Sequence, residues 1–167
     1  MLQLKEICKV LSQGLRPVKS PTLRSSSRGP LCLSLLSDSG LPLVTVSDSE
    51  VQKGSKLDME KFRLYTTMIA SEYLESRVSN KDATDVQGGY LTNNWSGVEL
   101  EKGLWSIITE VDGGGDFKPE TKLLLILFYA DDFPHSVAKL KLDNVCYVLN
   151  QELKGYLKLK NANDVSI

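Results

Sequence analysis

The stretch TKLLLILFYADDFPHSV, residues 121–137, carries the most informative pattern of this 167-residue chain. Its segment Leu123–Tyr129 is apolar without alternation, and a strand of this kind is buried on both faces. Such a strand lies in the centre of a sheet, with helices above and below it. Asp131 and Asp132 end the run, and a helix is predicted from about Ser136. The stretch therefore predicts a layered α/β domain of the α+β type.

The same residues also match a catalytic signature. Tyr129-Ala130-Asp131-Asp132 has the Y-x-D-D pattern of reverse transcriptases, but two-metal catalysis needs a third carboxylate and a nucleic-acid cleft. A net charge of −1 offers no basic surface for phosphates. The sequence contains no G-x-S-x-G motif, which would supply the nucleophilic serine of a hydrolase. The single histidine, His135, therefore lacks such a catalytic partner. A small enzyme using Asp131, Asp132 and His135 remains an alternative, and a strand end with a helix cap is favoured.

Apolar spacing predicts the other elements. Leu4, Ile7, Cys8 and Leu11 share one face of a helix that Gly14 ends. Four further segments complete the pattern: the two strands of a hairpin over residues 31–37 and 41–46, a long helix over residues 57–79, and a strand over residues 104–111. The order is α-β-β-α-β-(β)-β-α.

The helix over residues 57–79 is apolar over about half its circumference, wider than one packing surface needs. One face carries Phe62, Tyr65, Ile69 and Tyr73, and an adjacent face carries Leu57, Leu64 and Met68. This helix either sits deep in its own domain or packs against another chain.

Composition indicates one domain over residues 1–159, with extended loops at 16–28 and 79–97 and a disordered tail at 160–167. Apolar residues make up 41% and charged residues 25%, as in an ordinary globular protein. The three cysteines lie far apart, which favours reduced thiols and gives no metal or cofactor site. No apolar run reaches the ~20 residues that span a bilayer. We therefore expect neither cofactors nor direct membrane insertion.

The order of elements resembles the roadblock/LC7 family, most of all the roadblock subunits of the lysosomal Ragulator complex and its fungal vacuolar counterpart, the EGO complex. The segments that carry the resemblance are GLWSIITEV (103–111), LLLILFYADDFPHSVAKLKL (123–142), LKEICKVLSQGL (4–15) and LCLSLLSDSGLPLVTV (31–46). It implies a profilin-like α-β-β-α-β-β-β-α fold whose five-stranded antiparallel sheet has the order 2-1-5-4-3, with helices on both faces. We expect the strand over residues 104–111 to be the third, at an edge. The fourth would lie in Asp116–Lys122, short or irregular because of Pro119.

The resemblance also implies a function. It is that of a non-enzymatic scaffold subunit that holds Rag-type GTPases at the cytoplasmic face of the vacuolar or lysosomal membrane for TORC1 amino-acid signalling. The implied partners are another roadblock-fold subunit (in a heterodimer, or a homodimer when isolated), a lipidated anchor subunit and Rag-type GTPases, with no nucleic acid. The expected partner interface comprises Phe62, Tyr65, Met68, Ile69, Leu104, Trp105, Ser106, Ile107, Ile108 and Thr109. A dynein-light-chain-type or GTPase-regulating adaptor is the alternative within the same fold.

Overall fold

Strand β5, Lys122–Ala130, is the central strand of the sheet. The side chains of residues 124–129 are all buried, as the unbroken apolar run predicts. Its neighbours are β1, Cys32–Leu36, and β4, Leu104–Asp112, and both pair with it in the antiparallel sense. The prediction of a central strand buried on both faces is confirmed.

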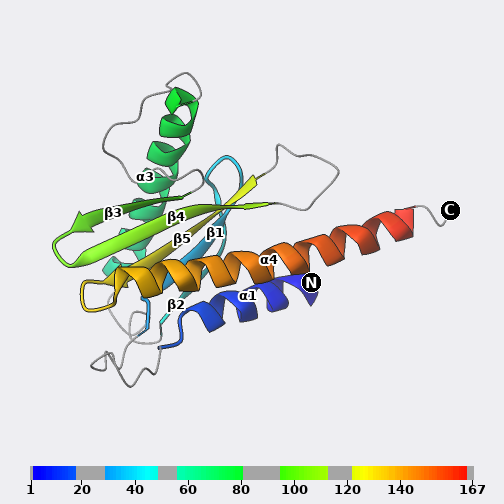
Figure 1. Cartoon of the computed structure of the whole chain (residues 1–167), viewed down its shortest axis with the longest axis horizontal. Coiled ribbons are helices and arrows are strands. Elements are labelled where there is room, and N and C mark those ends of the chain that lie inside the picture. The colour runs from blue at the N-terminus through cyan, green and yellow to red at the C-terminus, as the bar shows by residue number, and fades with distance from the viewer. Residues whose placement is uncertain (1, 18–28, 49–55, 81–94, 113–121, 165–167) are drawn as a thin grey trace.

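The computed structural model in Figure 1 describes residues 2–17, 29–48, 56–80, 95–112 and 122–164. In this part of the chain the elements follow the predicted order α-β-β-α-β-β-β-α. Strands β2, Pro42–Ser47, and β3, Trp95–Glu101, complete an antiparallel sheet of order β2-β1-β5-β4-β3. The predicted α+β fold class and strand order are confirmed.

Glycines with positive φ lie in the turns of the β1–β2 and β3–β4 hairpins. Gly40 between β1 and β2 has a φ of 87°, and Gly103 between β3 and β4 has a φ of 85°. A residue with a side chain pays about 1–2 kcal/mol in this left-handed region. Gly40 also approaches helix α3, Lys56–Asn80, because a Cβ atom added there would lie 3.2 Å from the Cβ atom of Ala70.

Successive side chains of a strand point to opposite faces of the sheet. Both faces are buried, because helices pack on each of them. Helices α1, Leu2–Gly14, and α4, His135–Asp164, cover one face, which carries Leu33, Leu35, Ile107, Val111, Leu125, Leu127 and Tyr129. Helix α3 covers the face that carries Cys32, Leu36, Leu104, Ile108, Leu124, Ile126 and Phe128. Figure 1 shows α3 behind the sheet and the other two helices in front of it.

Helices α1, Leu2–Gly14, and α4, His135–Asp164, lie side by side on their face of the sheet (Figure 1). They approach closely at Gly14, where a Cβ atom would lie 2.8 Å from Val145 Cγ2. The ammonium group of Lys141 donates hydrogen bonds to the carbonyl oxygens of Gly14, at 3.4 Å, and Arg16. Lys141 therefore caps the end of α1, whose last carbonyl groups have no partner within the helix.

Helix α3, Lys56–Asn80, crosses the opposite face. The ring of Phe62 meets that of Phe128 edge to face, with centroids 5.1 Å apart. Ile69, Ala70 and Tyr73 are buried farther along the same side of the helix. The predicted helix over residues 57–79 is confirmed, and one of its two apolar faces packs on the domain's own sheet.

Three expectations about the organisation of the chain are wrong. Strand β4 is not at an edge, because it pairs with β5 on one side and β3 on the other. The edge strand is instead β3, whose first residues were expected to belong to the 79–97 loop. No separate strand begins in Asp116–Lys122 among the described residues: Lys122 starts β5, and residues 113–121 lie outside them. Helix α4 continues to Asp164, so residues 160–164 are helical rather than disordered.

The other loop expectations fall largely outside the described ranges. This holds for residues 18–28 of the loop expected at 16–28, for residues 81–94 of the loop expected at 79–97, and for the last residues of the tail, 165–167.

Candidate functional site

Helix α3 presents large apolar side chains to solvent. Leu64 is 60% exposed and Met68 is 55% exposed, although both stand on a helix whose other side is buried in the core. They are four residues apart and therefore neighbours on the helix surface. The two side chains form a small exposed apolar patch on this side of the helix.

Strand β3 is a free edge beside this helix. Among the described strands it pairs with β4 alone, through the register Ser96↔Ile108, Gly97↔Ile107 and Val98↔Ser106. Val98 is 40% exposed at the middle of the strand. The strand contains no proline, so its outer backbone groups can pair with a further strand.

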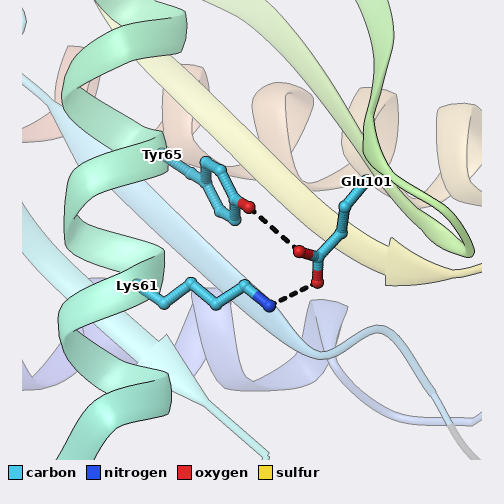
Figure 2. Close-up of polar contacts among 3 residues, drawn as sticks. All are labelled: Lys61, Tyr65 and Glu101. Carbon is cyan, nitrogen blue, oxygen red and sulfur yellow. Dashed lines mark hydrogen bonds and ion pairs between the residues drawn. The ribbon is translucent and has the colours of Figure 1, made fainter.

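A polar cluster fastens α3 to the end of β3. Figure 2 shows Lys61 and Tyr65 of α3 pointing toward Glu101. Lys61 donates to one carboxylate oxygen of Glu101, and the Tyr65 hydroxyl donates to the other at 3.1 Å. The hydrogen bond from Lys61 is the main cause that lowers the pKa of the Glu101 carboxyl. The charged form of Glu101 is thus the one that holds the helix and the strand together.

The other face of β3 is fastened to α4. The ammonium group of Lys139 lies 5.0 Å from the ring centroid of Trp95, within the range of a cation–π contact. Lys139 also pairs with Asp143 one helical turn on. With contacts to α3 at its end and to α4 at its start, β3 is held as a preformed edge.

The residues expected at the partner interface divide into two groups. Most of them are buried in the domain's own core: Phe62, Ile69, Leu104, Ser106, Ile107, Ile108 and Thr109. Tyr65 and Trp105 are half-buried, and Met68 is exposed. Residues 104–109 belong to β4, which already has a strand on each side, so the edge that is open to a further strand is β3.

Leu64, Val98 and Glu101 were not among the expected interface residues, although the sequence contains some signal for the first two. Leu64 stands on the second apolar face of the helix, beside Met68. In Gly97-Val98-Glu99-Leu100-Glu101, the apolar Val98 and Leu100 alternate with polar residues or glycine, but this alternation is too short to indicate a strand. Glu101 could not have been paired with α3 from its surroundings in the chain, because Tyr65 and Lys61 are 36 and 40 positions away.

The aspartate pair and the histidine form separate contacts. Asp131 and Asp132 are both exposed, and Asp131 accepts a 3.2 Å hydrogen bond from Trp105 Nε1. The Tyr129 hydroxyl and His135 Nδ1 are 2.7 Å apart. The main-chain amide of Asp131 also donates to the Gly103 carbonyl oxygen at 2.9 Å. These contacts tie the end of β5 to the β3–β4 turn and to the start of α4.

Two other classes of site are absent from the ranges that the structure describes. They hold no group of three or more His, Cys, Asp or Glu side chains placed to bind a metal ion. Within the same ranges, no helix combines the length and apolar character that a membrane crossing requires.

Comparison with known proteins places the chain in a family. The family model described as Protein SLM4 matches residues 1–158. Two solved structures share the fold: MglB with a tetrameric arrangement (16% identity, TM-score 0.61, covering 91% of this chain and 90% of that one) and the gliding protein MglB of Thermus thermophilus (15% identity, TM-score 0.60, covering 91% of each). No curated sequence matches the chain. Because the family match spans nearly its whole length, the chain belongs to the SLM4 family of EGO complex subunits.

Proposed function

We propose that this protein is a non-enzymatic scaffold subunit, which pairs with another roadblock-fold subunit and holds Rag-type GTPases at the vacuolar or lysosomal membrane for TORC1 amino-acid signalling. A lipidated partner subunit supplies the attachment to the cytoplasmic face of the membrane. Membership of the SLM4 family, and so of the EGO complex, supports this proposal.

The observation that carries the proposal is the free edge of β3 beside the exposed side chains of α3. Strand pairing across such an edge gives affinity through main-chain hydrogen bonds, and side chains on either face give specificity. Val98 from the strand and Leu64 and Met68 from the helix supply apolar area next to that edge. We define this set, β3 with Leu64 and Met68, as the pairing surface.

The electrostatics of the chain agree with a protein partner. The formal net charge is −1, with 20 basic and 21 acidic residues. Affinity for nucleic acid comes largely from many basic contacts to phosphates. The pairing surface has apolar side chains at its centre and only two charged residues, Glu99 and Glu101, toward one end of β3, which suits another folded subunit better.

The test is purification of the tagged full chain from its own cells, with identification of the proteins that accompany it. We expect a second roadblock-fold subunit, a lipidated subunit and Rag-type GTPases. The control is the Val98→Asp variant, which should lose the roadblock-fold subunit while remaining folded. Recovery of dynein chains without Rag-type GTPases or a lipidated subunit would contradict the proposal and favour a dynein-type adaptor.

A further inference from the structure

A hollow of about 220 Å³ lies between α3 and the neighbouring strands β3 and β4. Its lining residues are Ile69, Glu72, Tyr73 and Ser76 of α3 and Ser96 and Ile108 of the β3–β4 pair. Pockets for drug-sized ligands begin at about 300 Å³. The hollow is therefore suited to one side chain rather than to a cofactor.

The floor of the hollow is apolar. Ile69, Tyr73 and Ile108 are each less than a tenth exposed. The Tyr73 hydroxyl turns to Glu110, to which it donates a 3.0 Å hydrogen bond. This floor is suited to the methylene groups of a long side chain, which bury apolar stems while their polar ends stay near water.

The rim of the hollow is polar and acidic. Ser76 and Ser96 are half-buried and Glu72 is exposed. Within the described part of the chain, Glu72 belongs to none of the ion pairs. A cation placed between the two hydroxyl groups and this carboxylate would form charge-assisted hydrogen bonds, which are stronger than neutral ones.

The hollow is continuous with the pairing surface. Ser96 lies on β3, two residues before Val98, and Glu72 follows Met68 by one helical turn. A subunit that pairs along β3 and covers Met68 must therefore also cover the mouth of the hollow. Its nearest side chains are then the natural occupants.

We propose that the hollow receives a lysine or arginine side chain of the partner subunit, a proposal that rests on pairing through the pairing surface. The stem lies on Ile69, Tyr73 and Ile108, and the cationic head binds Glu72 with Ser76 and Ser96 at the rim. An apolar partner residue would leave Glu72 unpaired on a covered surface, and an acidic one would repel it. The hollow thus selects partners that carry a basic residue at this place.

The first experiment reverses the charge at the rim. Glu72→Lys should weaken the complex with the co-purified roadblock-fold subunit about tenfold or more, and Glu72→Gln should weaken it less. Glu60→Lys is the matched control, because Glu60 is also exposed on α3 but lies about three turns from Glu72. Equal affinities for Glu72→Lys and wild type, or equal losses in Glu72→Lys and Glu60→Lys, would overturn the proposal.

The second experiment identifies the occupant. Benzoylphenylalanine at Ser76 should crosslink to the partner segment that covers the hollow. Changing the basic residue of that segment to Glu should weaken the wild-type complex and restore the affinity of Glu72→Lys. A crosslink to a segment without lysine or arginine would sink the proposal, as would a crosslink formed only within the chain itself.

The two proposals fail in distinguishable ways. If Val98→Asp abolishes the complex while Glu72→Lys leaves it unchanged, the pairing surface stands and the hollow has no cationic occupant. If Val98→Asp has no effect, pairing through β3 is wrong, and the proposed occupancy of the hollow is overturned with it. Thermal unfolding of each variant alone shows whether a loss of affinity comes from a loss of fold.

Discussion

Tyr65 on α3 donates a 3.1 Å hydrogen bond to Glu101 at the end of β3, and Lys61 pairs with the same carboxylate (Figure 2). One acidic side chain thus holds a helical turn of α3 against the edge strand. The exposed Met68 and Val98 are thereby kept in a defined relation to each other. For the proposed partner, the pairing surface is thus preorganised, which would lower the entropy cost of binding.

The Lys61→Met variant should raise the pKa of Glu101 toward its ordinary value of 4.5. The reason is that the hydrogen bond from Lys61 is the largest of the causes that lower it. A carboxyl group whose pKa is lowered in the folded state stabilises the fold at pH values above its ordinary pKa. This stabilisation is lost as the pH falls through the lowered pKa. Carboxyl-detected NMR titration measures the pKa directly. The control is Lys102→Met, which removes a neighbouring positive charge; the same pKa in both variants would argue against the cluster.

The Val98→Asp variant should remain folded and lose its partner. Val98 is partly exposed in the free chain, so the carboxylate stays hydrated until a second strand covers it. Covering an unpaired charge costs about 2–5 kcal/mol, which is about thirtyfold or more in affinity. Sedimentation of the complex measures the loss. Leu43→Asp is the matched control, because Leu43 is also exposed but lies on β2, the opposite edge strand; an equal loss in the control would show that β3 is not special.

The Phe128→Ala variant should lower the free energy of unfolding by about 3–5 kcal/mol. Phe128 is fully buried on the central strand, and its ring packs against that of Phe62. Urea denaturation of the purified protein gives the difference. Leu140→Ala on the exposed side of α4 should change stability by less than about 0.5 kcal/mol. Comparable losses in the two variants would contradict the assignment of β5 as the core strand.

Tyr129 should ionise only at strongly alkaline pH. Burial raises the pKa of its phenol from 10.0 to about 12. Because the folded value is the higher one, the contribution of Tyr129 to stability is full below pH 10 and is lost as the pH rises through 12. Ultraviolet absorbance of tyrosinate follows the titration. Tyr129→Phe should remove the tyrosinate signal that appears near pH 12. If the variant instead lacks a tyrosinate signal at the pH at which the exposed tyrosines ionise, Tyr129 is not buried as described.

Much of the architecture could be predicted from local patterns. Leu123–Tyr129 has no polar residue, which only a strand covered on both sides tolerates, and it is the central strand. The wide apolar surface of the helix over residues 57–79 left open whether it packs on its own sheet or on another chain, and only the structure separates the buried Phe62 from the exposed Met68. Strand β3 escaped prediction because an edge strand has one neighbour and does not need a regular apolar alternation. Its short run of Val98 and Leu100 between polar residues resembles a loop.

The layers of this protein follow from local patterns in the chain, because the periodicity of apolar residues indicates which side chains are buried. The position of the free edge follows only from the folded arrangement of the strands. That depends on pairings such as Ser96↔Ile108, which join strands whose partners no local pattern specifies. The same holds for Glu101, which meets Lys61 and Tyr65 only after the sheet and α3 have packed. The candidate site is a product of that packing, since its charges and apolar groups come from separate elements.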